Sequence, residues 1–210
     1  MVLIYISYIK IFILLDFMKK EDIKIILKKI ITFLKEDSWP STIAFLILAA
    51  IFIKLILFPI LSFITGTSLP LVIVESCSMY HPNKGFENIL NNIYFEEDIS
   101  LEDTKNWPFK NGLNKGDIII AINPKNLEKG DVIIFEGGAN HPIIHRLIDD
   151  IEPYATKGDN PITNYHQLEN EKKIYENQII GKAIFRVPSL GWIKLFFFDI
   201  FKEQSQRGLC

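Results

Sequence analysis

The segment NKGDIIIAINPKNLEKGDVIIFE (residues 114–136) decides the fold class of this chain. It contains two short apolar runs, DIIIAI (117–122) and DVIIFE (131–136), and each begins just after a glycine. Runs of this length that are rich in β-branched residues and bounded by turn residues are typical of β-strands. The segment therefore predicts two consecutive strands.

Similar runs lie on both sides of this segment. They are LPLVIVES (69–76), PIIHRLI (142–148), YATK (154–157) and QIIGKAIFRV (178–187). Together the six runs predict a mainly β fold class, with a β-rich domain over residues 67–190. An insertion at residues 83–116 interrupts the strands. Because Ser100 and Asp103 are spaced like a capping box, we expect part of this insertion to be helical.

The residues before the β-rich domain predict a membrane anchor. STIAFLILAAIFIKLILFPILSFI (41–64) carries Lys54 as its only charge. As a helix it is long enough to cross the hydrocarbon core of a bilayer, and Pro59 is expected to kink its last turns. We therefore expect a transmembrane anchor over residues 38–66. A buried core helix is the alternative.

Residues 1–37 form an N-terminal apolar and basic segment. Within it, residues 19–37 mix isoleucine and leucine with lysine, which predicts a basic amphipathic helix on a membrane surface. Since the lysines precede the span, the positive-inside rule puts this segment in the cytoplasm and everything after Thr65 outside. Residues 2–17 are short for a span. They form a second transmembrane helix, an interfacial helix, or sequence upstream of a start at Met18.

The C-terminal tail, residues 191–210, begins with the apolar run GWIKLFFFDIF (191–201). The run is too short to span a membrane. We expect an interfacial segment beside the anchor, and a core helix is the alternative.

Composition limits the classes of function. Hydrophobic residues make up 49% of the 210 residues, and the formal net charge is -2. The chain therefore lacks the basic excess of a nucleic-acid binder, and we expect no nucleic-acid partner. Cys77 and Cys210 are too few for a disulfide framework, leave the redox compartment open, and do not have metal-site spacing.

The stretch VESCSMYHP (74–82) places two nucleophile types side by side, Cys77 and Ser78. In an extended segment Ser76 and Ser78 share one face, and Cys77 takes the other. Serine is a weak nucleophile at its free pKa and needs a nearby base to accept its proton. Ser78 is the preferred nucleophile, and Cys77 is the alternative.

His145 is the preferred base because it lies within a strand-like run whose neighbours fix its ring. A hairpin that pivots near Ile151 brings Asp159 opposite residues 143–145, where a carboxylate would hold the imidazole in one tautomer. Arg146 is an alternative partner for this carboxylate. His81 is an alternative base, although the sequence offers no group near it that would orient it.

A metal site is a further alternative. It would use His141 and His145 with Asp149 or His166, but strand geometry would hold the two histidine rings some 13 Å apart, about four residues of extended chain. We therefore expect neither a metal nor a cofactor.

Four motifs follow one another in the part of the chain after the anchor. They are S-x-S-M at 76–79, the paired G-D-[IV] at 116–118 and 130–132, His145-Arg146, and T-K-G-D-N at 156–160. In this order and spacing, over roughly residues 70–192, they resemble the type I signal peptidases, and within that family the archaeal and endoplasmic-reticulum branch.

The resemblance implies a membrane-anchored β-domain that cleaves signal peptides of secretory preproteins after small residues. It implies that Ser78 is the acylating nucleophile and that His145 is the general base, in the position where the bacterial branch uses lysine. It further implies that Asp159 supports the base, and that Ser76 or the Ser78 amide helps to form the oxyanion hole. The expected partners are signal peptides and membrane lipid, at the outer face of the cell membrane.

The chain departs from the family pattern at three places. Tyr80 and His81 both lie between Met79 and Pro82, where the family usually has one residue. Tyr165 stands where many members of this branch carry a second aspartate, and the insertion lengthens the gap between the first two strands. A non-catalytic membrane-anchored binding or scaffolding protein with the peptidase fold is therefore the alternative function.

Overall fold

The computed structural model describes residues 20–82, 86–87, 89, 94, 99–138, 141–198 and 210. The expectations for residues 2–17, and most of the tail beyond residue 198, lie outside this part. The chain forms two compact units, Met1–Phe58 and Pro59–Cys210.

The first unit contains helix α2 (Lys20–Leu34), which confirms the helix predicted within residues 19–37. Helix α3 (Trp39–Phe52) begins where the Ser38 hydroxyl accepts a hydrogen bond from the Ser41 amide at 3.4 Å, an N-cap that satisfies one free donor of the first turn. A π-helical turn, η1 (Ile53–Leu57), follows α3 directly.

The helix continues through α4 (Phe58–Thr65), so that Trp39–Thr65 is one apolar helix of 27 residues. By length and composition it is able to span a membrane, and within the described ranges it is the one helix that meets this condition. The π turn directly precedes the turn that contains Pro59, and the kink expected there stays a prediction.

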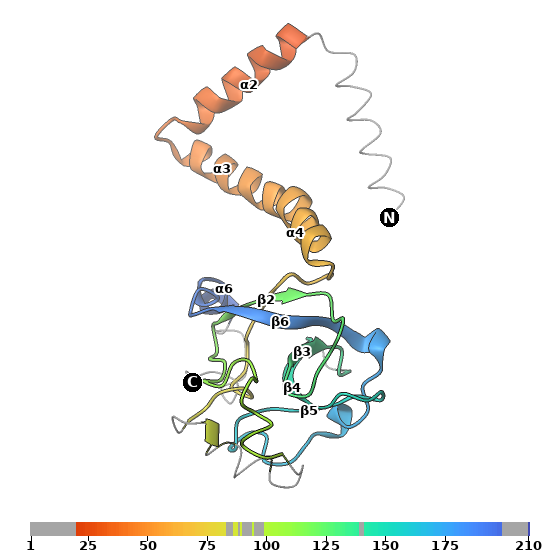
Figure 1. Ribbon diagram of the computed structural model, residues 1–210. Coiled ribbons are helices and arrows are strands. Elements are labelled where there is room, and N and C mark those ends of the chain that lie inside the picture. Colours follow the sequence, from red (N-terminus) through yellow and green to blue (C-terminus); the bar gives the residue numbers. More distant parts are fainter. Residues whose placement is uncertain are drawn as a thin grey trace. The chain divides into compact units, whose positions relative to one another are not determined.

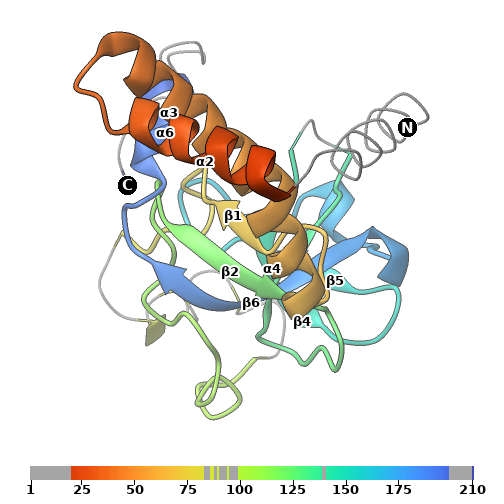
Figure 2. The ribbon, with the colours of Figure 1, turned by 90° about the horizontal axis from the view of Figure 1, so that it is seen from above.

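The second unit contains a six-stranded antiparallel sheet with the strand order β1-β2-β6-β3-β4-β5 (Figure 1). Five strands fall within predicted runs, and β4 extends one residue beyond its run, to Asp149. Figure 2 shows β2 and β6 side by side. With the helices included, the chain mixes helix and strand, so the mainly β prediction applies to the sheet alone. The strands are β1 (Leu71–Ile73), β2 (Ile118–Ile122), β3 (Val132–Phe135), β4 (Ile143–Asp149), β5 (Ala155–Lys157) and β6 (Ile179–Val187).

The sheet has a hydrophobic cluster on each face of β3 and β4. Val132 pairs with Arg146 and Ile133 pairs with His145, so these two neighbouring polar residues of β4 point to opposite faces. The face of Arg146 is packed by the cluster that includes Val74 and Met79, next to Ser78. The face of His145 is packed by a second cluster, whose buried members are Ile133, Phe135, Leu147, Ile174 and Ile179.

The two Gly-Asp pairs are turns that lead into β2 and β3. Gly116 and Gly130 have φ angles of +90° and +100°, which favour glycine, and each lies close to a tryptophan indole. Each aspartate accepts a backbone hydrogen bond from the residue three positions earlier and is paired with a cation of β6. The motif is thus explained by turn geometry at the ends of two strands.

The described part of the insertion forms a small core of its own over one end of β4. Its members are Phe86, Ile89, Tyr94, Ile99 and Trp107, which pack with Ile148. Ser100 and Asp103 make the reciprocal capping-box hydrogen bonds that the sequence predicted, at 2.6 to 3.3 Å. Residues 86, 87 and 89 are helical, whereas residues 101–106 are turns.

Helix α6 (Trp192–Phe198) buries Leu195 and exposes most of its other apolar side chains, among them Ile193 (69% exposed) and Phe196 (74% exposed). The alternative of a core helix at this position is therefore wrong. An interfacial position for this segment stays a prediction.

Candidate active site

Ser78 lies in a turn just after β1, and its Oγ is 3.1 Å from the Oγ of Ser76. The two hydroxyls therefore share one side of the segment, as the sequence predicted. Cys77 forms a disulfide bond with Cys210, a pairing that the analysis of the sequence did not anticipate. This bond occupies the sulfur of Cys77, the alternative nucleophile.

The backbone around Ser78 is held by hydrogen bonds on its carbonyl side. Asn160 donates from its side chain to the Cys77 carbonyl at 2.7 Å and from its backbone to the Ser78 carbonyl at 2.9 Å. The Leu113 amide donates to the Met79 carbonyl at 2.8 Å. Among the described residues the Ser78 amide has no hydrogen-bond acceptor. This amide is therefore available to stabilise an oxyanion.

His145 is buried on β4, and its Nδ1 contacts Oε1 of Glu171, which is itself fully buried. Glu171 ends the short helix η3 (Glu169–Glu171), and its Oε2 accepts a hydrogen bond from the Leu168 amide at 2.8 Å. The Leu168 amide thus holds one oxygen of the Glu171 carboxylate, and the other oxygen holds the His145 imidazole. Since Nδ1 is engaged, Nε2 is the His145 nitrogen left for proton transfer.

Gly158 packs against the turn that carries Ser78. It follows Lys157, the last residue of β5, which pairs with Arg146. A Cβ on Gly158 would lie 2.8 Å from the Ser78 carbonyl oxygen and 2.6 Å from the Asn164 side chain. A side chain at this position would therefore displace the Ser78 turn. Within the described part of the chain Ser78 and His145 are not hydrogen-bonded to each other.

Asp159 has partners other than His145. Its carboxylate accepts hydrogen bonds from Arg146 Nη2 at 2.6 Å and from the Tyr94 hydroxyl at 2.5 Å, and Oδ2 lies 2.9 Å from His81 Nε2. The expected contact between Asp159 and His145 is replaced by the ion pair with Arg146, which was the alternative. The physical reason is that His145 and Arg146 point to opposite faces of β4, and the Asp159 carboxylate lies on the face of Arg146.

Burial and charge set the ionisation of this cluster. Burial by itself would raise the pKa of Asp159, but the Arg146 guanidinium and the hydrogen bond with His81 lower that pKa far below its usual range. Burial likewise opposes the charge of Arg146, yet Asp159 raises the pKa of the guanidinium. Burial, and then the charge of Asp159, raise the pKa of Tyr94 well above its usual value. The cluster is therefore a permanently charged pair with a neutral tyrosine.

His81 has an orienting partner, contrary to the expectation from the sequence, because Asp159 lies against its Nε2. Its Nδ1 is buried and has no hydrogen-bond partner among the described residues. Since its one engaged nitrogen faces a carboxylate that Arg146 already neutralises, His81 is less suited than His145 to accept the Ser78 proton.

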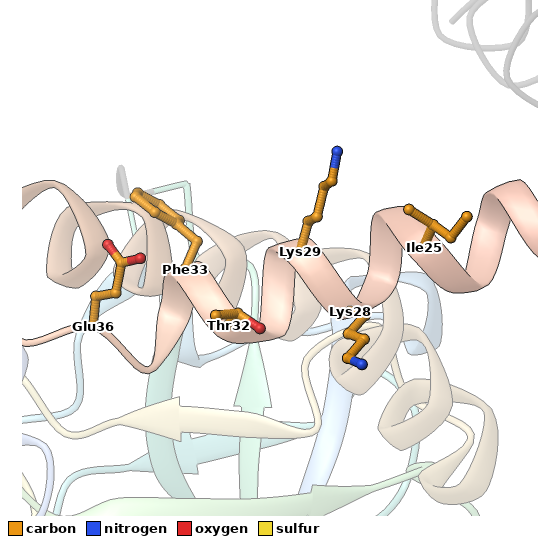
Figure 3. Close-up of a pocket in the computed structure, with 6 residues that line it drawn as sticks. All are labelled: Ile25, Lys28, Lys29, Thr32, Phe33 and Glu36. Carbon is orange, nitrogen blue, oxygen red and sulfur yellow. The ribbon is translucent and has the colours of Figure 1, made fainter.

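The remaining candidates lie apart from this arrangement. The part of the chain that the structure describes holds no group of three or more potential metal ligands. Tyr165 is about half exposed and packs edge-on against the His166 ring at 4.8 Å. A hollow on α2, in the other unit, has two lysines that point to different sides of the helix (Figure 3). It is lined by Ile25, Lys28, Lys29, Thr32, Phe33 and Glu36.

Sequence reasoning missed Glu171. It lies 26 residues after His145, in a polar segment without strand or motif pattern, so no local signal marks it.

Comparison with models of protein families found no family that matches this chain, and comparison with curated proteins found no match.

Proposed function

We propose that this chain is a membrane-anchored serine endopeptidase that removes signal peptides from secretory preproteins, as its resemblance to the type I signal peptidases implies. Ser78 is the nucleophile, His145 is the general base, and Glu171 takes the place of the expected Asp159 beside the base. The observation that carries the proposal is the buried contact of Glu171 with His145 Nδ1, which gives the expected base a carboxylate partner.

The proposed reaction is acyl transfer in two steps. His145 Nε2 takes the proton of Ser78, the Ser78 oxygen attacks the scissile carbonyl carbon, and the imidazolium then gives this proton to the leaving amine. A water molecule next loses a proton to Nε2 and attacks the ester, which releases the new carboxyl end and restores Ser78. Glu171 stabilises the imidazolium in both steps.

Two donors are suited to the developing oxyanion. The Ser78 amide has no acceptor among the described residues, and the Ser76 hydroxyl lies 3.1 Å from the nucleophilic oxygen. Because Asn160 already holds the carbonyls of Cys77 and Ser78, these donors are fixed in place before the substrate binds. Such preorganisation is usually a large part of the rate enhancement in acyl transfer.

The edge of the sheet supports an extended peptide as the substrate. β1 is an edge strand, and the backbone groups of Pro70 and Val74 bond toward β2. Backbone groups alternate along a strand, so those of Leu71 and Ile73 point toward the open edge. An extended preprotein segment would pair there and run toward Ser78. Selection of small side chains at the scissile bond follows from the family resemblance.

The apolar helix supports a substrate at the membrane. Ser78 lies about 13 residues after Thr65, so at most roughly 45 Å of extended chain separates it from the end of the helix. A signal peptide is itself apolar and ends at its cleavage site on the outer face of the membrane. In the proposed orientation the lysines of α2 are cytoplasmic and the sheet lies outside.

A cleavage assay in membranes tests the proposal. The full chain and its Ser78→Ala, Cys77→Ala and His145→Ala variants are each reconstituted in vesicles with a secretory preprotein, and shortening of the preprotein is followed with and without a chelator. We expect cleavage by the wild type and by Cys77→Ala only, whether or not the chelator is present. Cleavage by Ser78→Ala at the wild-type rate would contradict the proposal.

A second candidate function is a non-catalytic binding module that keeps the peptidase fold. The observation in its favour is that no hydrogen bond joins Ser78 to His145 in the described part of the chain. The same assay separates the two. A wild type that binds the preprotein and leaves it intact would favour the binding module.

A further inference from the structure

The C-terminal segment contacts the strand that leads to Ser78 at three alternate residues. Gly191 lies so close to Ile73 that a Cβ on the glycine would be 2.7 Å from Ile73 Cγ2. Lys194 Nζ lies 3.3 Å from a Glu75 carboxylate oxygen, and Cys210 is bonded to Cys77. We call these three contacts, made by Gly191, Lys194 and Cys210, the C-terminal brace.

The brace lies behind the nucleophile. Ile73, Glu75 and Cys77 each contact the brace, while the hydroxyls of Ser76 and Ser78 lie 3.1 Å from each other. The contacts of Gly191 continue into the sheet, because its amide donates to the Gly116 carbonyl at 2.8 Å and the Gly116 amide donates to Val74 at 2.9 Å. The segment before Ser78 is thus held between the sheet and the C-terminal segment.

The disulfide is the strong contact of the brace. The ion pair of Lys194 with Glu75 is partly exposed to solvent, and pairs of this kind stabilise a fold only slightly. The disulfide joins residues 133 positions apart, with Cα atoms 5.9 Å from each other, an ordinary separation for this bond. It closes a loop that contains β2 to β6. Breaking it frees one side of the nucleophile turn without cutting a hydrogen bond of the sheet.

We propose that the Cys77–Cys210 disulfide is a redox-sensitive positioning device for Ser78. A dithiol reductant supplies two electrons and two protons, becomes a disulfide itself, and leaves Cys77 and Cys210 as thiols. The Cys77 and Ser78 carbonyls stay bound to Asn160, so the sheet stays folded, but the side of the turn behind Ser78 loses its covalent support. The inference rests on the proposed function for the part that concerns Ser78 reactivity.

The disulfide also indicates on which side of the membrane the sheet lies. Disulfides form and persist in oxidising compartments and are rare where cytosolic thiols are reduced. An intact Cys77–Cys210 bond therefore indicates that the second unit of the chain lies outside the cytosol. This agrees with the orientation inferred from the lysines of α2.

The test uses the full chain in vesicles, in its oxidised state, after treatment with a dithiol, and as the Cys210→Ser variant. Because the chain has two cysteines, any effect of the dithiol on the enzyme is assigned to this one bond. We expect peptide mapping of the oxidised chain to find Cys77 linked to Cys210. We expect reduction to lower kcat/KM about tenfold, as a small displacement of a catalytic group does, and Cys210→Ser to show the same loss with no response to the dithiol.

Hydrogen exchange provides a readout that does not depend on catalysis. The amides of residues 74–79 are expected to exchange faster after reduction, whereas those of β3 and β4 keep their protection. Lys105→Ala is the control for Lys194→Ala, because Lys105 forms an exposed ion pair with Glu102 away from the brace. We expect Lys194→Ala, unlike this control, to speed exchange at residues 74–79.

The outcomes separate the two proposals. Free thiols in the chain isolated from membranes, or equal exchange at residues 74–79 in both redox states, would overturn the brace. Equal cleavage by the oxidised and reduced chains would overturn its effect on Ser78. If the oxidised wild type does not cleave the preprotein at all, the proposed function fails, and the brace is then judged by mapping and exchange alone.

Discussion

At the scale of single residues, two buried carboxylates have separate tasks. Asp159 neutralises the buried Arg146, whereas Glu171 contacts the imidazole of His145. The two acids lie on opposite faces of β4, since neighbouring residues of a strand alternate between faces. Removing the charge of Asp159 should therefore impair folding, and removing the charge of Glu171 should impair catalysis.

Replacing each acid by its amide tests this division. Asp159→Asn leaves Arg146 buried without a counter-charge, and such changes cost about 3 kcal/mol of folding free energy or more. Glu171→Gln removes the charge that stabilises the imidazolium, so kcat should fall by a factor on the order of 10³ while the melting temperature changes little. Denaturant unfolding and cleavage kinetics of both variants measure the two effects. Equal losses of activity at equal losses of stability would contradict the division.

The low pKa of Asp159 predicts how stability depends on pH. Its pKa is lower in the folded chain than in the unfolded chain, where it is about 3.9. A group of this kind stabilises the fold above the unfolded pKa, and the contribution is lost as the pH falls through the folded pKa. The difference in melting temperature between wild type and Asp159→Asn should be constant from pH 8 to about pH 5 and shrink below about pH 4. A difference that grows on acidification would contradict the assignment.

Gly158 is expected to tolerate no side chain. In Gly158→Ala the new Cβ would meet the Ser78 carbonyl oxygen and the Asn164 side chain at distances below 3 Å, so the nucleophile turn has to move. We expect cleavage to fall at least about a hundredfold, since displacements near 1 Å have effects of this size. Gly138→Ala is the matched control for the loss of a glycine, because a Cβ there meets nothing within 4 Å, although its positive φ adds some strain.

At the scale of elements, the edge strand β1 is the proposed binding site of the substrate. Leu71 and Ile73 direct backbone groups away from β2, and Ser78 follows a few residues later. A substrate bound by strand pairing depends on its own backbone amides at alternate positions.

Peptide substrates with single N-methylated amides test this dependence. Methylation at alternate positions before the scissile bond should raise KM about tenfold, because each methyl group removes a donor to β1, whereas methylation at the intervening positions should have little effect. Cleavage kinetics of the peptide series measure this. A series in which every position has the same effect would contradict pairing with β1.

The elements also show how far sequence reasoning extends. All six strands, helix α2 and the apolar helix were predictable, because short β-branched runs and long apolar runs carry strong local signals. The face of the sheet to which Asp159 points was not predictable. It depends on the strand register, and a slip of one residue moves a side chain to the opposite face. The partners Glu171 and Cys210 were not predictable either, because each meets its partner only through the folded chain.

At the scale of the whole molecule, a helix able to span a membrane precedes a folded sheet that carries the proposed site. The helix Trp39–Thr65 ends close in sequence to β1, so the proposed site follows the anchor directly. If the sheet lies outside, added protease should digest the second unit in intact cells from which the outer wall is removed, while α2 becomes accessible only after lysis. Protection of the sheet before lysis would contradict the proposed orientation.

If Ser78 is the nucleophile, its hydroxyl becomes acylated during cleavage. A rapid acid quench of the full chain during turnover of a preprotein, followed by digestion and mass spectrometry, detects this adduct. We expect an ester between the new carboxyl end of the signal peptide and Ser78, which is absent in Ser78→Ala and accumulates when deacylation is slowed. Cleavage that proceeds with no adduct on Ser78, or with the adduct on another residue, would contradict it.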